Sequence, residues 1–300
     1  MVEFRQLDLS RDISEQGEFD VILHKLSEDI MFRSRRTKSD ERLRRLEKYS
    51  SMANPHRCAI TDPFCSVAKV INRVTAMDTL KAVYQTLGKS ACVPQPPHYI
   101  VVEAGSSPQS IRDQTRRARL RYPLICKPIE ACGSPGSHNM LVVLDECSLS
   151  VITAPTVVQE FRNHRARLFK VCVLGDVVRV YERPSLPDLS NDLAGHLEFD
   201  SQKPYPTLKD FGGTGNGAEP GEQAASDCSL PEGFALVAAE RLREAFGLSL
   251  FGFDLIVDSA SGEVLCIDVN YFPSFKDLED FPMVQQTNPI HTSGVTEAIH

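Results

Sequence analysis

The chain has 300 residues and a formal net charge of −7, from 33 lysines and arginines against 40 aspartates and glutamates. This acidic balance argues against a general nucleic-acid coat protein, yet a local basic cleft for a small polyanion can form on an acidic protein. The length predicts two or three packed units, and 42% hydrophobic residues are typical of a soluble globular protein. No apolar run reaches the roughly 18 residues of a membrane span, and the charged first segment does not predict a secretory signal.

The nine cysteines are scattered along the chain, and none forms a Cys-x-x-Cys pair. Several of them lie inside apolar runs, such as 124–126 and 265–267. This pattern predicts buried free thiols in a reducing cytoplasm, and it argues against disulfides and against a structural zinc site.

Two strands are predicted at 2–9 and 19–26, and the second carries His24 and Lys25 near its end. A helical stretch with an excess of basic residues follows, from about Asp29 to Lys48. Such a run is usually a solvated helix face, and the other interpretation is a basic wall beside an anionic ligand.

A second helix is predicted from Val67 to Leu87, with Ser66 as its N-cap and Gly88 at its end. Prolines at 94, 96 and 97 mark a linker, and a strand at 98–103 follows it.

The middle of the chain reads as a strand at 122–128, a glycine-containing loop at 129–138 and a strand at 139–144. Backbone amides of such a loop can cradle phosphate, and Lys127 at the end of the first strand could neutralise it. The loop joins strand to strand and lacks Gly-Lys-Ser/Thr, so it is neither a Walker A loop nor a dinucleotide-binding turn. Taken alone, it fits an ordinary hairpin turn better than a nucleotide lid.

Lys170 interrupts the apolar strand 168–174, which follows another apolar run at 156–161. Because desolvating an ammonium group costs several kcal/mol, such a lysine is rarely buried without a partner. Lys170 therefore either lies at an edge, with its amine in water, or faces a ligand anion. The histidines show no metal-binding spacing, and His24, His138 and His164 are expected to be ordinary surface or core residues.

A strand at 177–184 precedes residues 187–230, whose low apolar density and crowded glycines predict a long mobile insertion. A helix at 234–245 ends at Gly247, and a hairpin with strands at 248–258 and 263–270 follows. Residues 285–300 lack the apolar periodicity of a terminal helix.

The hairpin carries the strongest chemical signal in the chain. With a turn centred on Ser261, Asp258 pairs with Val264 and Asp254 pairs with Asp268. Two carboxylates directly opposite on neighbouring strands repel each other unless a cation lies between them. Asn270 projects from the same face as Asp268, because it lies two residues further along the strand. These oxygen donors suit Mg²⁺, although one aspartate could instead be a solvated strand-end residue.

Several segments together resemble the inositol-tetrakisphosphate 1-kinase (inositol 1,3,4-trisphosphate 5/6-kinase) family. In chain order they are HKLSED (24–29), RVTAMD (73–78), YPLICKPIEACGSPGSH (122–138), VVQEFRNHRARLFKVCVLGD (157–176), ERPSLP (182–187), SLFGFDLIVD (249–258) and IDVNYFPSF (267–275). The resemblance implies an α/β (α+β) ATP-grasp fold, with ATP and two Mg²⁺ ions as cofactors. It also implies a monomeric kinase that phosphorylates inositol 3,4,5,6-tetrakisphosphate at position 1 and inositol 1,3,4-trisphosphate at position 5 or 6.

The resemblance implies a role for each matching position. The nucleotide contacts would be Arg73, Lys127, Gln159, Glu160, Phe161, Lys170 and Ser185, and the metal ligands would be Asp254, Asp268 and Asn270. The inositol phosphate contacts would be Lys25, His138, Lys170, Asn270 and Ser274, with Lys170 and His138 as the catalytic pair. Where this chain has Ser274, the family often has glycine.

Three units are expected from the resemblance. They are an N-terminal inositol-phosphate-binding α/β domain at 1–79 without the family's first strand and helix, a central grasp subdomain at 80–160 with the glycine loop, and a C-terminal grasp subdomain at 161–300 with the metal site. Two other functions stay open at this point. One is ligation of a carboxylate to an amine on the same fold, and the other is inositol phosphate binding without catalysis by a truncated form.

Overall fold

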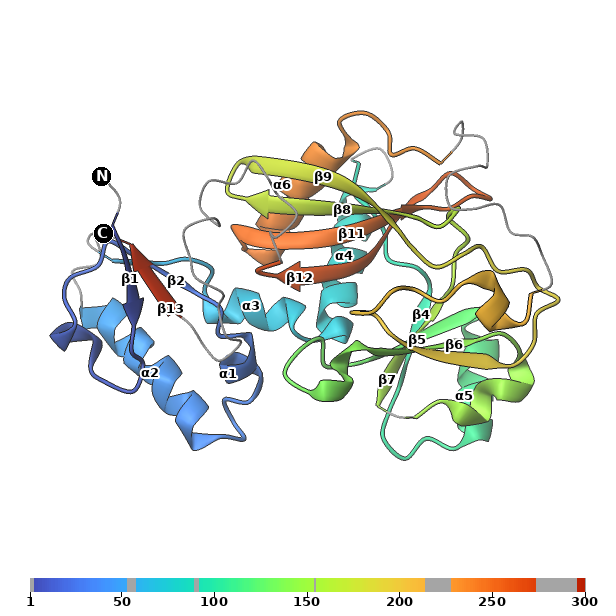
Figure 1. The fold of residues 1–300 in the computed structure, drawn as a ribbon, viewed down its shortest axis with the longest axis horizontal. Helices are drawn as coiled ribbons and strands as arrows, with labels where there is room; N and C mark the ends of the chain where they lie inside the picture. The colour runs from blue at the N-terminus through green and yellow to red at the C-terminus, as the bar shows by residue number, and fades with distance from the viewer. Residues whose placement is uncertain are drawn as a thin grey trace.

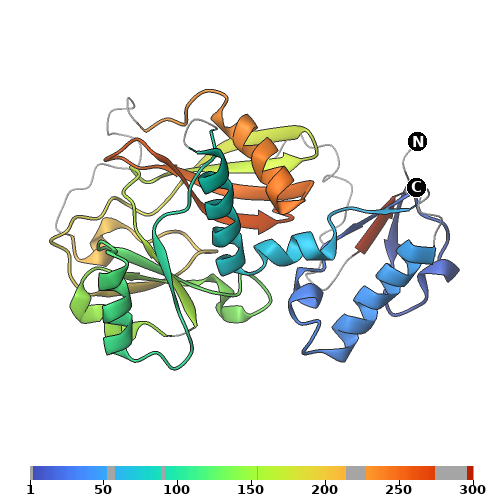
Figure 2. The ribbon, with the colours of Figure 1, turned by 180° about the vertical axis from the view of Figure 1, so that it is seen from behind.

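The computed structural model describes residues 3–52, 58–88, 92–153, 155–213, 228–273 and 296–299, the last of these as backbone only. These residues form three β-sheets with helices packed against them (Figures 1 and 2). Within the same ranges, no helix combines the length and the apolar composition needed to cross a membrane.

The N-terminal sheet has the strand order β1-β13-β2-β3. Its strands are β1 (Phe4–Leu7), β2 (Val21–His24), β3 (Ala59–Ile60) and β13 (Thr296–Ile299), with the short helix η1 (Ile13–Glu15) after β1. β13 pairs antiparallel with both β1 and β2, so the last strand lies between the first two (Figure 1). Residues 296–299 therefore complete the N-terminal sheet, although the sequence analysis assigned them to the C-terminal unit.

The helix predicted at 29–48 is interrupted. The structure has α1 at Ser27–Met31 and α2 at Thr37–Met52, and residues 32–36 connect them. Leu43 and Leu46 of α2 are fully buried against Ile22 and Leu26, while most of the helix surface remains accessible. This narrow apolar stripe is enough to hold α2 on the N-terminal sheet.

The helix predicted at 67–87 is divided as well, into α3 (Phe64–Val70) and α4 (Arg73–Leu87). Asn72 is the N-cap of α4, because its side-chain oxygen accepts from the backbone N–H groups of Val74 at 2.9 Å and Thr75 at 3.2 Å. Ser66, the predicted N-cap, lies inside α3, whereas Gly88 ends α4 as predicted. The break places Arg73 at the first position of α4.

The central sheet is antiparallel and has the order β10-β6-β5-β7-β4. Its elements are β4 (Tyr99–Val102), α5 (Pro108–Arg117), β5 (Leu124–Pro128), η3 (Pro135–His138), β6 (Asn139–Val143), η4 (Glu146–Val151), β7 (Thr156–Glu160) and β10 (His196–Asp200). The strand, loop and strand predicted at 122–144 are therefore β5, η3 and β6.

The prediction of a mobile insertion at 187–230 is wrong for its first part. β10 comes from this segment and pairs with β6, and the short helix η5 (Leu208–Phe211) follows. Leu189 and Phe211 are buried in a cluster with Val142 and Leu144. Few but well-placed apolar residues thus attach 187–213 to the central sheet, and 214–227 lie outside the described residues.

The C-terminal sheet has the order β12-β11-β8-β9. Its strands are β8 (Arg167–Leu174), β9 (Val177–Pro184), β11 (Leu250–Val257) and β12 (Val264–Tyr271), and α6 (Phe234–Phe246) precedes β11. Figure 2 shows α4 and α6 on one face of this sheet, where their apolar side chains form one core with Phe251 and Phe253. α4 spans the predicted boundary at residue 79, but it packs with the C-terminal sheet.

Candidate active site

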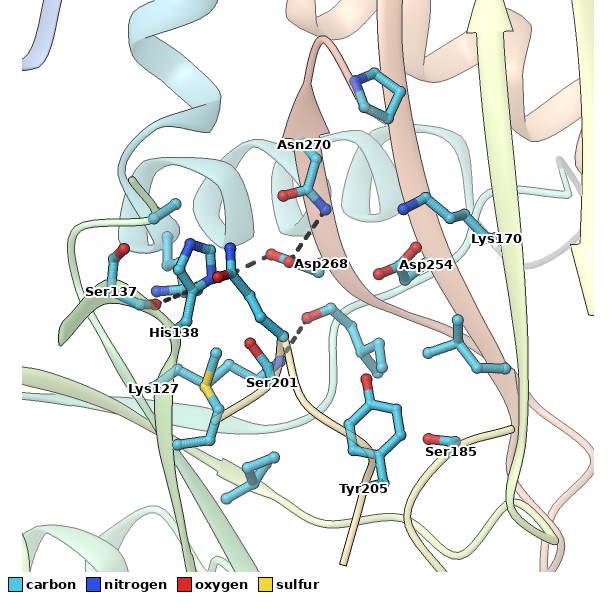
Figure 3. A pocket seen from close by; sticks show the side chains of 18 of the residues that line it. Lys127, Ser137, His138, Lys170, Ser185, Ser201, Tyr205, Asp254, Asp268 and Asn270 are labelled. Carbon is cyan, nitrogen blue, oxygen red and sulfur yellow. Dashed lines mark hydrogen bonds and ion pairs between the residues drawn. The ribbon is translucent and has the colours of Figure 1, made fainter. Parts of the chain in front are cut away.

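A cleft of about 2950 Å³ opens between the three sheets, and residues from all of them line it. Every predicted site residue within the described ranges lines this cleft: Lys25, Arg73, Lys127, His138, Gln159, Glu160, Phe161, Lys170, Ser185, Asp254, Asp268 and Asn270. Ser274, predicted as a substrate contact, lies outside the described residues. Figure 3 shows the centre of the cleft.

A lysine and two aspartates form a row across three neighbouring strands. Asp254 of β11 pairs with Asp268 of β12, as predicted. On its other side Asp254 pairs with Lys170 of β8 (Figure 3). Lys170 does not lie at a sheet edge, because β8 pairs with β11 on one side and with β9 on the other, and its strand brings a cation next to the paired carboxylates in the cleft.

The predicted register is wrong closer to the hairpin turn. A bulge between Asp254 and Leu255 shifts the pairing by one residue, so Val264 pairs with Val257 and not with Asp258. Asp258 instead accepts a hydrogen bond from Arg162 at 2.6 Å. The bulge lies between the turn and the carboxylate pair, so the pairing of Asp254 is unaffected.

The two opposed carboxylates create an unfavourable arrangement that a cation would relieve. Burial, and then the charge of Asp268, raise the pKa of Asp254 to about 6. Its Oδ1 atom is buried and has no hydrogen-bond partner among the described residues. Asn270 Nδ2 donates to Asp268 Oδ2 at 3.1 Å, which leaves the amide oxygen of Asn270 for a ligand.

These donors fit a magnesium ion. They are hard oxygen atoms, and Mg²⁺ is usually held by one or two carboxylates together with substrate phosphates and water. In the described ranges, no group of three or more His, Cys, Asp or Glu side chains is placed to bind a metal. A metal bound to Asp254, Asp268 and Asn270 would therefore take its remaining ligands from a nucleotide and from water.

Lys127 reaches this centre from the central sheet. Its Nζ donates to the carbonyl oxygen of Ile267 on β12 at 2.7 Å. The side chain is buried, and this burial lowers the pKa of Lys127, while the charge of Asp268 raises it. An ammonium group has three donors, so two remain for a phosphate group.

Arg73 holds both ends of the glycine loop. Its guanidinium donates to the carbonyl oxygens of Pro128 at 2.6 Å, Glu130 at 3.1 Å and Ser137 at 3.2 Å. Its buried Nε lies 4.0 Å from Asp268 Oδ1 and has no hydrogen-bond partner among the described residues. Most of its donors thus bind the chain itself, so Arg73 holds the glycine loop in position.

Replacing Arg73 with alanine is expected to lower the free energy of unfolding by about 3 kcal/mol, because three carbonyl oxygens lose a charged donor. The surface variant Arg116→Ala, which loses an exposed ion pair with Glu146, should change stability by less than about 1 kcal/mol. Urea denaturation of both variants measures the difference. Equal stabilities would contradict a role of Arg73 in holding the loop.

Residues 159–161 lie at the end of β7, where the chain leaves the central sheet and continues toward the C-terminal sheet. Gln159 Nε2 lies 3.2 Å from the sulfur of Met77, and its Oε1 is buried without a partner among the described residues. The Glu160 carboxylate accepts from Arg121 and Arg162, so its side chain is already bound within the protein. The Phe161 ring lies 5.7 Å from that of His164.

Ser185 is held by His164, a residue that the sequence analysis treated as an ordinary histidine. His164 Nδ1 lies 2.6 Å from the carbonyl oxygen of Arg162, which can only accept, so Nδ1 carries the proton. Nε2 then accepts from the Ser185 hydroxyl at 2.8 Å. Burial lowers the pKa of His164 and keeps the ring neutral. The segment QEFRNH (159–164) was the available signal for this residue.

The buried neutral ring predicts a pH dependence. Below about pH 6.5 the unfolded chain binds a proton at His164 that the folded protein excludes, so stability falls as the pH falls. Between about pH 7.5 and about pH 5.5 the unfolding free energy should therefore decrease, as His164 of the unfolded chain takes up a proton. Urea denaturation at both pH values should show a smaller decrease for His164→Gln than for the unmodified protein. An equal decrease would contradict a neutral His164.

Lys25 enters the cleft from the N-terminal sheet. Its Nζ lies 5.3 Å from the centre of the Phe272 ring, which follows β12. The carbonyl oxygen of the preceding residue, His24, accepts from the Tyr271 hydroxyl at 2.7 Å. This hydrogen bond joins the end of β2 to the end of β12, and so it holds Lys25 near Asn270.

His138 lies at the end of η3, on the glycine-loop side of the cleft (Figure 3). Its carbonyl oxygen accepts from the backbone N–H of Ser201 at 2.9 Å, so the segment after β10 is attached to the loop. Tyr205 in this segment points toward the carboxylates (Figure 3), and burial followed by the charges of Asp254 and Asp268 raises its pKa. Tyr205 was not among the predicted site residues, because it lies in the predicted insertion.

The basic residues between α1 and the middle of α2 separate into two groups. Arg33 and Arg44 pair with Asp40, and Arg35 pairs with Glu130. A second group lines the cleft and consists of Arg36, Lys38 and Arg42. One part of the basic run is therefore an ion-paired, solvated surface, and another part is a basic wall of the cleft.

Comparisons with solved structures gave low similarity. VanG D-Ala:D-Ser ligase from Enterococcus faecalis has a TM-score of 0.47 and 17% identity, over 85% of this chain and 64% of that chain. A RimK domain ATP-grasp protein from Sphaerobacter thermophilus has a TM-score of 0.47 and 13% identity, over 87% of this chain and 76% of that chain.

Sequence comparisons were more specific. Inositol-tetrakisphosphate 1-kinase 1 of Zea mays is 30% identical over 300 residues, which cover 96% of this chain and 81% of the relative. Inositol-tetrakisphosphate 1-kinase 2 of Glycine max is 32% identical, covering 93% of this chain and 82% of the relative. Inositol-tetrakisphosphate 1-kinase of Danio rerio is 29% identical, covering 93% and 69% respectively.

Family models match both parts of the chain. Residues 88–288 match the inositol 1,3,4-trisphosphate 5/6-kinase ATP-grasp domain, and residues 1–64 match the pre-ATP-grasp domain of the same family. The resemblance seen in the separate motifs thus extends over most of the sequence. This chain belongs to the inositol 1,3,4-trisphosphate 5/6-kinase family and has its ATP-grasp fold.

Proposed function

We propose that this protein transfers the terminal phosphoryl group of ATP to a hydroxyl of an inositol polyphosphate. The observation that carries the proposal is the row of Lys170, Asp254 and Asp268 at the centre of a cleft with basic residues on its other walls. This arrangement puts oxygen ligands for a metal beside a cation for the transferred group. The relatives are named inositol-tetrakisphosphate 1-kinases, which supports an inositol polyphosphate as the acceptor.

The preferred acceptors that we propose are inositol 3,4,5,6-tetrakisphosphate, phosphorylated at position 1, and inositol 1,3,4-trisphosphate, phosphorylated at position 5 or 6. On the acceptor side, the contacts would be Lys25, His138, Lys170 and Asn270, together with Ser274. Lys25 follows β2, His138 ends η3 and Lys170 lies in β8, so these contacts come from three different parts of the fold, which suits a ligand whose anionic groups point in several directions.

On the nucleotide side, the proposed contacts are Lys127, residues 159–161 at the end of β7, Lys170 and Ser185, while Arg73 positions the glycine loop. The Glu160 carboxylate is bound to Arg121 and Arg162, so we assign its nucleotide contact to the backbone. Asp254, Asp268 and Asn270 would hold two Mg²⁺ ions, which when bound neutralise charge on the β- and γ-phosphates.

The chemical step breaks the bond between the γ-phosphorus and the ADP oxygen, forms a bond from that phosphorus to the inositol oxygen and releases the proton of the inositol hydroxyl to solvent. Phosphoryl transfer has a loose transition state, so orientation and charge stabilisation contribute more than a strong base. In this mechanism Lys127 binds the phosphate chain from the central sheet, while Lys170 and His138 contact the transferred group and the acceptor.

The test is an assay of the purified chain with radiolabelled ATP, Mg²⁺ and a panel of inositol phosphates. We expect ADP and a more highly phosphorylated inositol in equal amounts. Omission of the inositol phosphate should leave only slow ATP hydrolysis.

Two other outcomes would contradict the proposal. ADP formation that requires both a carboxylate and an amine would identify a ligase. Binding of inositol phosphates, measured by calorimetry, without any ADP formation would identify a binding protein.

A further inference from the structure

The segment between α1 and α2 lies directly on the glycine loop. Gly133 has a φ of +81°, and a Cβ atom built there would lie 2.8 Å from the ring of Phe32. Arg35 Nη1 also pairs with Glu130 Oε1 at 3.1 Å. The lack of a side chain at Gly133 therefore lets the N-terminal unit contact the loop, with Phe32 buried between them.

Phe32 in turn supports Arg36. The guanidinium carbon of Arg36 lies 3.9 Å from the centre of the Phe32 ring. Stacking uses one face of the guanidinium and leaves its N–H groups free in the plane, where they can bind a phosphate in a bidentate way. Neither Arg36 nor Lys38 makes an ion pair with any residue that the structure describes, and both line the cleft.

The charges around these two residues favour an anion. On this wall of the cleft, positive side chains outnumber negative ones. The positive ones are Lys25, Arg36, Lys38 and Arg42, and the negative ones are Glu28 and Asp29. Arg42 Nη1 and Asp29 Oδ2 are 3.4 Å apart, so these two charges largely offset each other. α2 begins at Thr37, and the positive end of its dipole adds to the potential near Lys38.

We propose that Arg36 and Lys38 form a second phosphate-binding subsite for the acceptor, at the wall formed by the start of α2. This inference rests on the proposed function, and it concerns phosphate groups that point away from the reacting hydroxyl. A ligand with few phosphates satisfies the cations near Lys170 and leaves this subsite empty. A ligand with phosphates around the whole ring fills both, so the subsite favours the more highly phosphorylated inositols.

The test compares two double variants that remove the same charge from the same region. Arg36→Ala/Lys38→Ala removes the subsite, and the control Arg44→Ala/Lys48→Ala removes two cations of α2 that do not line the cleft. Binding of inositol hexakisphosphate and of inositol 1,3,4-trisphosphate is measured by calorimetry at fixed ionic strength. Inositol hexakisphosphate carries a phosphate on every ring carbon, so its orientation in the cleft does not affect the comparison.

The subsite variant should bind inositol hexakisphosphate at least about tenfold more weakly, and inositol 1,3,4-trisphosphate less than about threefold more weakly. The control should change both affinities by less than about twofold, since its charges act only at long range. Equal weakening for the two ligands, or equal losses in the two variants, would overturn the inference.

Failure of this inference is distinct from failure of the proposed function. If the unmodified protein phosphorylates inositol phosphates but the variants do not discriminate between the two ligands, only the subsite is wrong. If it phosphorylates none of the panel, the kinase proposal is wrong, and the binding ratios still decide whether Arg36 and Lys38 form a phosphate subsite.

Discussion

Asp254→Asn is expected to abolish phosphoryl transfer and to raise the free energy of unfolding of the ligand-free protein. The folded protein raises the pKa of Asp254 from 3.8 to about 6, through burial and the nearby charge of Asp268. The folded state thus holds this proton more tightly than the unfolded state, and stability is lost as the pH rises from about 4 to about 6. Above that window the ionised carboxylate lowers the free energy of unfolding by about 2–3 kcal/mol. An asparagine at this position would not have this effect. Since Asp254 is a proposed metal ligand, its replacement should lower kcat at least about 1,000-fold.

Urea denaturation near pH 8 and near pH 5.5 checks the stability effect, because the advantage of the variant should shrink as the pH falls. Addition of Mg²⁺ and ATP should stabilise the unmodified protein more than the variant. Asp113→Asn, which removes an exposed carboxylate on α5, is the control and should alter neither property. A less stable Asp254→Asn protein would mean that the carboxylate is held by favourable interactions, which would argue against an ion-binding pair.

Lys170→Ala is expected to lower kcat/KM for the inositol phosphate by about 100-fold or more, equivalent to about 3 kcal/mol of transition-state stabilisation. Lys170 lies in register with Asp254, lines the cleft and lowers the pKa of that carboxyl. Its loss removes a cation beside the transferred group, and it also makes Asp254 harder to ionise. The activity of the variant should therefore begin at a higher pH than that of the unmodified protein.

The control for this prediction is Lys81→Ala, which removes an exposed lysine of α4 outside the cleft. Steady-state kinetics should show less than about a twofold change for this variant. Full turnover by Lys170→Ala across the pH range would show that Lys170 is only a strand residue with its amine in solvent.

Local patterns predicted the elements whose contacts are close in the sequence. The β11–β12 hairpin has a short turn, so the pairing of Asp254 with Asp268 followed from counting residues across it. The count failed between Leu255 and the turn because a bulge adds one residue to one strand, and alternation of apolar residues does not reveal where that happens. The signals for α6 and for its end at Gly247 are also local in the sequence, since an apolar stripe and a glycine cap define them.

The interruption between α3 and α4 and the strands β10 and β13 could not be predicted from local patterns. Helical periodicity continues through 71–72, yet the helix is interrupted there by backbone hydrogen bonds to the glycine loop. The Arg73 N–H donates to the Ile129 carbonyl oxygen, and the Ala131 N–H donates to the Ile71 carbonyl oxygen, both at 2.9 Å. β10 and β13 are short, and each forms only because a distant strand offers unpaired backbone groups. Such partners are chosen by the whole fold.

The sequence by itself determined the chemistry of the site: paired carboxylates on a hairpin, a lysine within an apolar strand and a glycine loop after Lys127. It did so because buried charges and opposed carboxylates are costly wherever they occur, so each of them requires a partner, either a ligand or a neighbouring group of the protein. Only the tertiary structure decided that Lys25, Lys127 and Lys170, from three different sheets, line one cleft. It also decided that Arg36 and Lys38 line this cleft while Arg33 and Arg44 do not. The contact between Phe32 and Gly133 places these residues, and it joins segments about 100 residues apart. No local pattern specifies such a contact.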